Sequence, residues 1–409
     1  MSDLSDFLPT AVLVLETGEV FPGIAIGANQ SDSTGTLCFN TAMTGYQEAI
    51  TDPSYVGQLL VFSFPHIGNV GTNEADQENE QSLLQGVIVG QLPTQPSNYR
   101  SQMALNDYLI KRGILGIAQV DTRALIMCIR KAKRAINAVI QRLDTRSVSS
   151  GQVDWRSESH QHKLQSVAIK SPGLTDVKLD QVSCKVPYEW QEDLPMISPL
   201  RARLRQNALA LNVVVMDFGV KHSILRVLKT LGCRVWVVPF GTTATEMLSF
   251  HPDAIVLSNG PGDPRSIPDA VLHTLKKLVD HQLPMFGICF GYQLLALLHG
   301  AEVIKLPCGH HGNNHPVQVL DTKDILITSQ NHEFAVNEVL MPACLIPTHR
   351  SLFDGSLEGF RVRHQPILAV QFHPEAGPGP TDALTLFHDF FTMVESHQQR
   401  VDVLAVAHA

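Results

Sequence analysis

The sequence predicts an α/β protein with two domains. Residues 1–207 are expected to form a β-rich N-terminal domain with a linker, and residues 208–397 a doubly wound, mainly parallel-sheet domain with a nucleophile elbow. Three observations support this. The chain of 409 residues is longer than one ordinary domain. From Leu211 onward, apolar strands alternate with short helices, which indicates a parallel sheet covered on both faces. The apolar run 284–288 then passes through a G-x-C-x-G turn at Cys289 into helical spacing.

The first domain is expected to hold more strands than helices. Its apolar runs predict strands, and two stretches have helical spacing, the second with an Asp-Thr start. The predicted strands are 11–16, 20–26 and 59–63, the predicted helices are 101–112 and 121–130, and the predicted loops are 39–48 and 65–73. From about residue 151 to 206 the chain becomes polar and is interrupted by prolines, which indicates the later part of the first domain running into a linker.

In the second domain each strand precedes a helix, so a ligand site is expected at the C-terminal edge of the strands. The predicted strands are 213–218, 234–240 and 254–257, and the predicted helices are 224–231, 244–250 and 382–394. The tail 400–409 is expected to be a frayed appendage.

Composition excludes several classes of protein. A net charge of −8 without a dense basic run argues against nucleic-acid binding. Seven cysteines without a C-x-x-C pair are typical of reduced intracellular thiols. The acidic N-terminal segment disfavours a signal or transit peptide, and no apolar run approaches a membrane span. We therefore expect a cytoplasmic protein without a membrane contact.

Cys289 is the candidate nucleophile. The glycines on both sides of the turn let the backbone reverse sharply, which sets the sulfur at a helix N-terminus. Unsatisfied amides and the helix dipole favour the thiolate there. The competing interpretation is a small buried hydrophobic residue, which most free cysteines are. A single short motif leaves both interpretations open.

A second motif supplies the partners for a nucleophile. The strand-like run 366–372 ends in His373-Pro-Glu375, and residues i and i+2 of an extended chain point the same way. Glu375 can therefore orient His373, which completes a nucleophile, base and orienting group. In Cys289, His373 and Glu375 the chain resembles the class I, or triad, glutamine amidotransferases. This resemblance implies that residues 208–397 form a class I glutamine amidotransferase domain.

Four strings in the first domain carry a more specific resemblance. They are FNTAMTGYQE from Phe39, TDPSY from Thr51, PHIGNVGTN from Pro65 and DTRAL from Asp121. In these strings the chain is similar to the small subunits of carbamoyl-phosphate synthetases, which carry close counterparts in this order. Other triad amidotransferases lack this domain. The resemblance covers nearly the whole chain and implies that residues 1–207 form the N-terminal domain of that family.

The resemblance also implies the residues that contact the substrate, L-glutamine. Glycines in the loop after the strand 254–257 let backbone amides hold a developing oxyanion, and the amide of the residue after the nucleophile is the second donor. The implied set is Ser54, Gly260, Gly262, Phe290, Gln293, Asn331, Glu333 and Phe334. Glu333 stands where close relatives carry glycine, so its carboxylate would repel the substrate's α-carboxylate unless it points to solvent.

The histidine-rich stretch from Cys308 to His315 also invites a metal interpretation. His310, His311 and His315 lie close together in the sequence, but no settled helix or strand is predicted to hold their spacing. We therefore expect no metal site and no cofactor in this chain.

The combined motifs predict the glutaminase subunit of a glutamine-dependent carbamoyl-phosphate synthetase. The resemblance implies a hetero-oligomer with a large subunit that uses ATP and Mg²⁺ to make carbamoyl phosphate for arginine and pyrimidine synthesis. This chain has no G-x-x-x-x-G-K-[ST] loop of its own. Three alternatives remain: a stand-alone cysteine hydrolase, an amidotransferase that serves another synthase, and a regulatory subunit without enzymatic activity.

Overall fold

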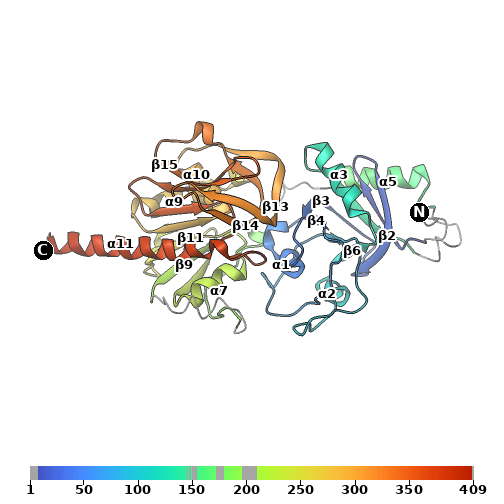
Figure 1. Cartoon of the computed structure of the whole chain (residues 1–409), viewed down its shortest axis with the longest axis horizontal. Helices are drawn as coiled ribbons and strands as arrows, with labels where there is room; N and C mark the ends of the chain where they lie inside the picture. Colours follow the sequence, from blue (N-terminus) through green and yellow to red (C-terminus); the bar gives the residue numbers. More distant parts are fainter. Residues whose placement is uncertain are drawn as a thin grey trace. The chain divides into compact units, whose positions relative to one another are not determined.

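A computed structural model describes residues 8–144, 146, 149, 154–171, 179–195 and 210–407. The chain divides into two compact units, Met1–Val177 and Lys178–Ala409 (Figure 1). The division lies earlier than the predicted boundary at 207/208, which itself falls outside the described residues. The reason is that β8 (Tyr188–Trp190) pairs with β10 (Arg234–Pro239), so part of the predicted linker belongs to the second unit.

The first unit is a closed barrel with the strand order β1-β2-β6-β5-β4-β3-β7. Its strands are β1 (Ala11–Leu15), β2 (Val20–Gly27), β3 (Asp32–Asn40), β4 (Gln58–Phe62), β5 (Gly86–Ile88), β6 (Leu115–Ala118) and β7 (Asn137–Arg142). Its helices include α1 (Tyr46–Thr51), α2 (Leu105–Arg112), α3 (Thr122–Ala132) and α5 (Glu158–Ile169), with the short 3-10 helix η2 (Pro53–Tyr55). The stretch 39–48, predicted as a loop, therefore contains the end of β3 and the start of α1.

The barrel core follows the two-residue period of its strands. In β1, Leu13 and Leu15 pack into one apolar cluster, while Val12 and Val14 pack into another that includes Leu164 of α5. Every residue of β1 is buried, because both sides of the strand are covered.

The second unit is a ten-stranded sheet with the order β14-β13-β15-β16-β17-β12-β11-β9-β10-β8. Its further strands are β9 (Asn212–Asp217), β11 (Ala254–Leu257), β12 (Met285–Ile288), β13 (Val303–Val319), β14 (Ile325–Val336), β15 (Leu345–Ser351), β16 (Leu357–Val362) and β17 (Ile367–Val370). Strands β10, β9, β11, β12 and β17 are parallel neighbours, whereas β8 and the strands β13 to β16 pair antiparallel. The predicted fold class is confirmed.

Helices cover both faces of this sheet. In β9, Val213 and Val215 pack with α7 (His222–Thr230) and α11 (Thr385–Ala407). Their alternate neighbours pack against the other set of helices, which are α8 (Ala244–Leu248), α9 (Asp269–Asp280) and α10 (Phe290–Leu298). Since both faces are apolar, the strands read as continuous hydrophobic runs.

Two predictions for this unit are wrong. Helix α11 continues to Ala407, so residues 400–407 of the predicted tail are helical rather than frayed. The histidine-rich stretch lies in the long strand β13, whose pairing with β14 shifts register between Lys305 and His310 and between Gly312 and His315. These irregularities accommodate the glycines and asparagines that had disfavoured a strand.

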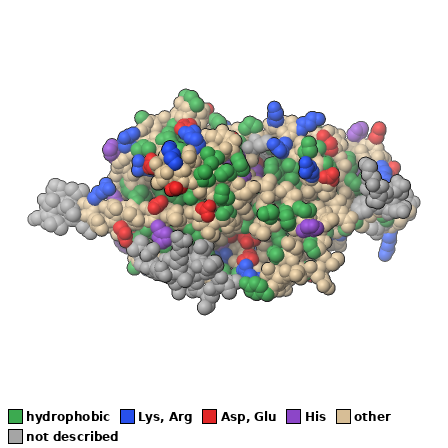
Figure 2. All heavy atoms as spheres, viewed as in Figure 1, with side chains coloured by type: hydrophobic (Ala, Val, Ile, Leu, Met, Phe, Trp, Pro, Cys, Tyr) green, Lys and Arg blue, Asp and Glu red, His purple; other side chains and the backbone are tan. Residues whose placement is uncertain are grey.

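Two further features concern the charge on the surface and the hydrophobicity of the helices. Lys and Arg side chains are interspersed with Asp and Glu over the face seen in Figure 2. Within the described part of the chain, no helix is long and apolar enough to cross a membrane.

Candidate active site

Cys289 occupies the turn between β12 and α10. Its backbone has φ 53° and ψ −99°, a conformation that a non-glycine residue adopts only under strain. Cys289 is the N-cap residue of α10 and is 2% exposed. Its amide donates to the carbonyl of Val370 at 2.9 Å, which ties the turn to the neighbouring strand β17. This geometry is the strand, turn and helix expected of a nucleophile elbow.

The two flanking glycines are required by close packing. A Cβ on Gly287 would lie 2.7 Å from a methyl carbon of Leu295, and one on Gly291 would lie 2.3 Å from the carbonyl oxygen of Leu257. Contacts this short do not occur between non-bonded atoms, so any side chain at either position would displace the elbow. The G-x-C-x-G pattern is therefore imposed by the packing of α10 onto β11 and β12.

The substitution Gly291→Ala is expected to destabilise the second unit by more than about 2 kcal/mol and to reduce activity. The reason is that the Leu257 carbonyl belongs to a packed sheet and cannot move away from the added Cβ. The matched control is Gly241→Ala, since a Cβ at Gly241 meets no atom within 4 Å. That control is expected to change stability by less than about 1 kcal/mol. Urea unfolding of both variants measures the difference, and equal losses would contradict the packing argument.

His373, Glu375 and Lys221 form a buried chain of charges. His373 Nδ1 and Glu375 Oε1 are 2.7 Å apart. Lys221 Nζ donates to the same carboxylate oxygen at 2.9 Å and to the carbonyl of Ala376 at 2.8 Å. All three side chains are at most 2% exposed. Because Nδ1 faces a carboxylate, it carries the proton, and Nε2 is the atom left for chemistry.

The sheet topology brings His373 to Cys289. Strands β12 and β17 are parallel neighbours, so Cys289 and His373 leave the same edge of the sheet. The Cys289 side chain contributes to the raised pKa of His373, so the contact favours the protonated ring. Nevertheless, Nε2 of His373 has no hydrogen-bond partner of normal geometry among the described residues. The two side chains are neighbours, and His373 Nε2 is free to take part in chemistry.

The pKa values of the dyad are shifted in opposite directions. Burial opposes charge on His373, but the Glu375 carboxylate and the hydrogen bonds outweigh burial and raise the pKa of His373 above its ordinary value. Burial likewise opposes charge on Glu375, whereas the Lys221 ammonium and then His373 lower the pKa of that carboxyl. The dyad is therefore an imidazolium and a carboxylate at neutral pH, and the positive ring lies beside Cys289.

The raised pKa of His373 predicts a pH-dependent stability. Between the ordinary histidine pKa of about 6.5 and the raised folded-state pKa, the folded protein binds more protons than the unfolded chain. The free energy of unfolding should therefore fall as pH rises through this window. The variant His373→Gln is expected to show a smaller fall, and His299→Gln, a half-buried histidine outside the dyad, the same fall as the unmodified protein. Denaturant unfolding from pH 6.5 to 10 measures this, and identical slopes in all three proteins would contradict it.

Two backbone segments are predicted to hold the oxyanion, the loop with Gly260 and Gly262 and the start of α10 at Phe290. Gly260 packs against the strand end at Phe218, because an added Cβ would lie 2.4 Å from its carbonyl oxygen. Gly262 has φ 90°, a left-handed conformation that favours glycine. Phe290 begins α10 directly after the nucleophile, and its ring packs 5.5 Å from that of Phe218. The loop and the helix start thus meet around Phe218, while the role of their amides stays a prediction.

Gln293 and Asn331 are connected to the nucleophile through hydrogen bonds. The Nε2 atom of Gln293 donates to the carbonyl of Phe334 and to Gln371 Oε1, both at 3.0 Å. Gln371 Nε2 in turn lies 3.7 Å from Cys289 Sγ. The carbonyl oxygen of Asn331 lies 3.6 Å from the same sulfur. Strand β14 therefore runs directly past the nucleophile.

Glu333 has a cationic partner. Its carboxylate oxygen Oε2 lies 3.2 Å from Lys305 Nζ, which also lies over the ring of Phe334 at 5.8 Å. Lys305 offsets the negative charge that the sequence had identified as unfavourable for glutamine.

Ser54 belongs to the first unit. It lies in η2, where its amide donates to Asp52 Oδ1 at 2.8 Å. Its contact with glutamine stays a prediction.

Sequence reasoning did not identify Lys221 or Gln371. Lys221 follows the carboxyl end of β9, at the same sheet edge as Cys289, and a lysine at such an edge is a usable signal. Gln371 directly follows β17 and lies two residues before His373, and residues 371–372 form a bend. Lys221 and Gln371 could therefore have been proposed from their positions at the sheet edge that carries Cys289.

Comparisons with known proteins agree with this geometry. Residues 214–393 match the family described as glutamine amidotransferase class-I, and residues 13–149 match the carbamoyl-phosphate synthase small chain, CPSase domain. The chain is 44% identical over 395 residues to the carbamoyl phosphate synthase small chain of Salmonella typhimurium, covering 96% of this chain and 99% of the relative. It is 43% identical over 385 residues to the protein of the same name from Halomonas eurihalina, covering 94% and 98%.

Among solved structures, a putative GMP synthase protein from Thermoplasma acidophilum is 27% identical. That match has a TM-score of 0.41 and covers 47% of this chain and 98% of the other.

Proposed function

The chain belongs to the family of carbamoyl phosphate synthase small chains, and from this premise we propose that it is the component that hydrolyses glutamine and supplies ammonia for carbamoyl phosphate synthesis. One observation carries the proposal. Cys289 stands on a strained elbow beside an imidazole that is held by a buried carboxylate. This arrangement has the nucleophile, the acid and base, and the orienting group of an acyl transfer.

The first half of the reaction forms a thioester. The Cys289 thiolate attacks the side-chain amide carbon of glutamine, and the carbonyl oxygen becomes an oxyanion. The amides of the Gly260 to Gly262 loop and of Phe290 hold this charge in the proposal. Nε2 of His373 gives its proton to the nitrogen, the carbon–nitrogen bond breaks, and ammonia leaves. Glu375 and Lys221 keep the imidazole oriented during this transfer.

The second half releases glutamate. His373, now neutral, takes a proton from water, and the resulting hydroxide attacks the thioester carbon. The carbon–sulfur bond breaks, glutamate leaves, and Cys289 returns as a thiolate beside the imidazolium. In the proposal, the glutamine is positioned by Gln293, Asn331 and Phe334.

The product determines what the partner must do. Ammonia is useful only while it is unprotonated, so it must pass to a site that consumes it before it reaches bulk water. We propose that this partner is a large subunit, with ATP and Mg²⁺ bound there and no cofactor needed by this chain for glutamine hydrolysis. We also place the protein in the cytoplasm, which the six cysteines with described side chains support because they are free thiols.

The test is glutamine turnover by the purified chain before and after mixing with a large subunit recovered from the native host by pull-down. We expect slow turnover by the isolated chain and a large rise on mixing. Fast turnover without a partner, together with repeated failure to recover a larger ATP-binding chain, would support the stand-alone hydrolase instead. Normal assembly without any glutamine turnover would support the regulatory subunit.

A further inference from the structure

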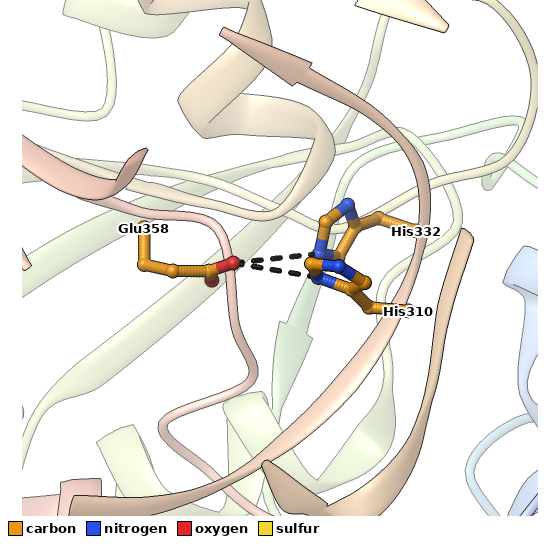
Figure 3. Close-up of side chains that lie close together, drawn as sticks. All are labelled: His310, His332 and Glu358. Atoms are coloured by element: carbon orange, nitrogen blue, oxygen red, sulfur yellow. Dashed lines mark ion pairs between the residues drawn. The ribbon is translucent and has the colours of Figure 1, made fainter. Parts of the chain in front are cut away.

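Three buried side chains from three strands converge in the second unit. His310 lies in β13, His332 in β14 and Glu358 in β16, and one ligand atom from each lies within 4.8 Å of the others (Figure 3). Glu358 Oε1 is 3.5 Å from His310 Nδ1 and 3.9 Å from His332 Nε2. Strand pairing sets this arrangement, because His310 and His332 are direct partners across β13 and β14.

The hydrogen bonds on the far side of each ring fix the tautomers. His332 Nδ1 lies 2.8 Å from the carbonyl oxygen of Phe334, and His310 Nε2 lies 3.0 Å from Asp354 Oδ2. Both oxygens only accept, so these two nitrogens carry the protons. In the neutral rings, His332 Nε2 and His310 Nδ1 therefore direct lone pairs toward the Glu358 carboxylate.

The centre of the cluster is unsatisfied. Neither His310 Nδ1 nor His332 Nε2 has a hydrogen-bond partner among the described residues, and both atoms are buried. Their distances to Glu358 Oε1, 3.5 and 3.9 Å, are long for hydrogen bonds. Two nitrogen lone pairs and a carboxylate therefore face one another in a buried space. A cation between them would satisfy all three groups.

We propose that His310 Nδ1, His332 Nε2 and Glu358 Oε1 bind a divalent transition-metal ion, with Zn²⁺ as the best match. Two imidazoles and one carboxylate are a common zinc ligand set, with bonds of about 2.1 Å. In a tetrahedral ion such bonds place ligand atoms about 3.4 Å apart. The observed 3.5 and 3.9 Å are close to that value, and all three ligand atoms lie within 4.8 Å of one another.

The surroundings support a metal site. Ligating histidines usually donate their second nitrogen to a carboxylate or a carbonyl, as His310 does to Asp354 and His332 does to Phe334. The other Glu358 oxygen, Oε2, accepts from Gln330 Nε2 at 2.9 Å, so the carboxylate is also held in place. The Ser356 hydroxyl approaches Oε1 at 3.3 Å but lies closer to Asp354, at 2.8 Å. An ion here would join β13, β14 and β16. The proposal does not depend on the glutaminase reaction.

The test uses untagged Cys289→Ser protein, because that background removes the active-site thiol as a competing ligand. After chelator treatment, the protein is titrated with Zn²⁺ and with Co²⁺ as a spectroscopic probe. We expect one equivalent of either ion per chain, a higher melting temperature with Zn²⁺, and a tetrahedral Co²⁺ spectrum without a thiolate charge-transfer band. Absence of stoichiometric binding, or a thiolate band, would overturn the proposal.

Variants in the same background locate the ion. Glu358→Gln keeps the side-chain shape and is expected to weaken Zn²⁺ binding at least about 100-fold, and His310→Gln provides a second loss of one ligand. His299→Gln is the matched control and should bind as the parent does, since His299 contacts Leu295 and Gln365 instead. Unchanged binding in Glu358→Gln would place the ion elsewhere and refute the site. If that variant fails to fold, the Co²⁺ spectrum of the parent and His310→Gln still decide the question.

Discussion

Replacing Cys289 by serine is expected to reduce glutamine hydrolysis by at least about 10³-fold while leaving ammonia-dependent synthesis in the complex intact. A hydroxyl fits where the thiol fits, so the elbow should keep its geometry. The alkoxide is far less accessible than the thiolate, however, and the imidazolium of His373 cannot compensate for that difference. Glutamate release and carbamoyl phosphate formation from added ammonia are the two measurements.

Cys344→Ser is the matched control for this prediction. Cys344 is a free, partly buried thiol in the same unit, and no catalytic role is proposed for it. Its variant should retain glutamine turnover. Full glutaminase activity in Cys289→Ser would remove the proposed mechanism, and equal losses in both variants would point to a general effect of losing a thiol.

Replacing Lys221 by methionine is expected to lower the free energy of unfolding by about 3–5 kcal/mol and to reduce glutamine turnover. The variant removes the ammonium that contacts the buried Glu375 carboxylate and the Ala376 carbonyl, so only His373 still offsets the carboxylate charge. The double variant Lys221→Met/Glu375→Gln should regain much of the stability, because the buried carboxylate is gone, but it should not regain activity.

Lys276→Met is the control for the lysine substitution. Lys276 pairs with Asp280 at 3.7 Å, and both side chains are more than 60% exposed. Such a pair contributes at most about 1 kcal/mol. Urea unfolding of the four proteins separates the effects, and similar losses in the two single lysine variants would show that burial of the Lys221 pair does not matter.

The elbow could be predicted from sequence because the glycines and apolar runs that mark it are adjacent in the chain. Gly287 and Gly291 are fixed by the packing of α10, and the apolar runs on either side show the strand and the helix directly. The contact between His373 and Glu375 was also predicted, but the extended-chain reason was wrong: Pro374 and Glu375 lie in a turn, closed by the Ala376 amide donating to the His373 carbonyl at 3.2 Å.

Other features depended on contacts between distant segments. The stretch around His310 looks like a loop by composition, yet it is a strand because β14 supplies hydrogen bonds along its length. The segment near Tyr188 looks like a linker, yet it adds an edge strand to the sheet beside β10. In both cases cross-strand pairing outweighed the local preference for turns.

The sequence by itself predicted two domains and the alternation of strands and helices in the second half, and it singled out Cys289, His373 and Glu375 as candidates. Periodicity and glycine spacing are properties of neighbouring residues, so these followed without coordinates. Only the tertiary structure decided that Lys221 holds Glu375, that Lys305 faces Glu333, and that His310, His332 and Glu358 converge. Those contacts join residues far apart in the chain, and the register of strand pairing, which depends on the whole sheet, brings them together.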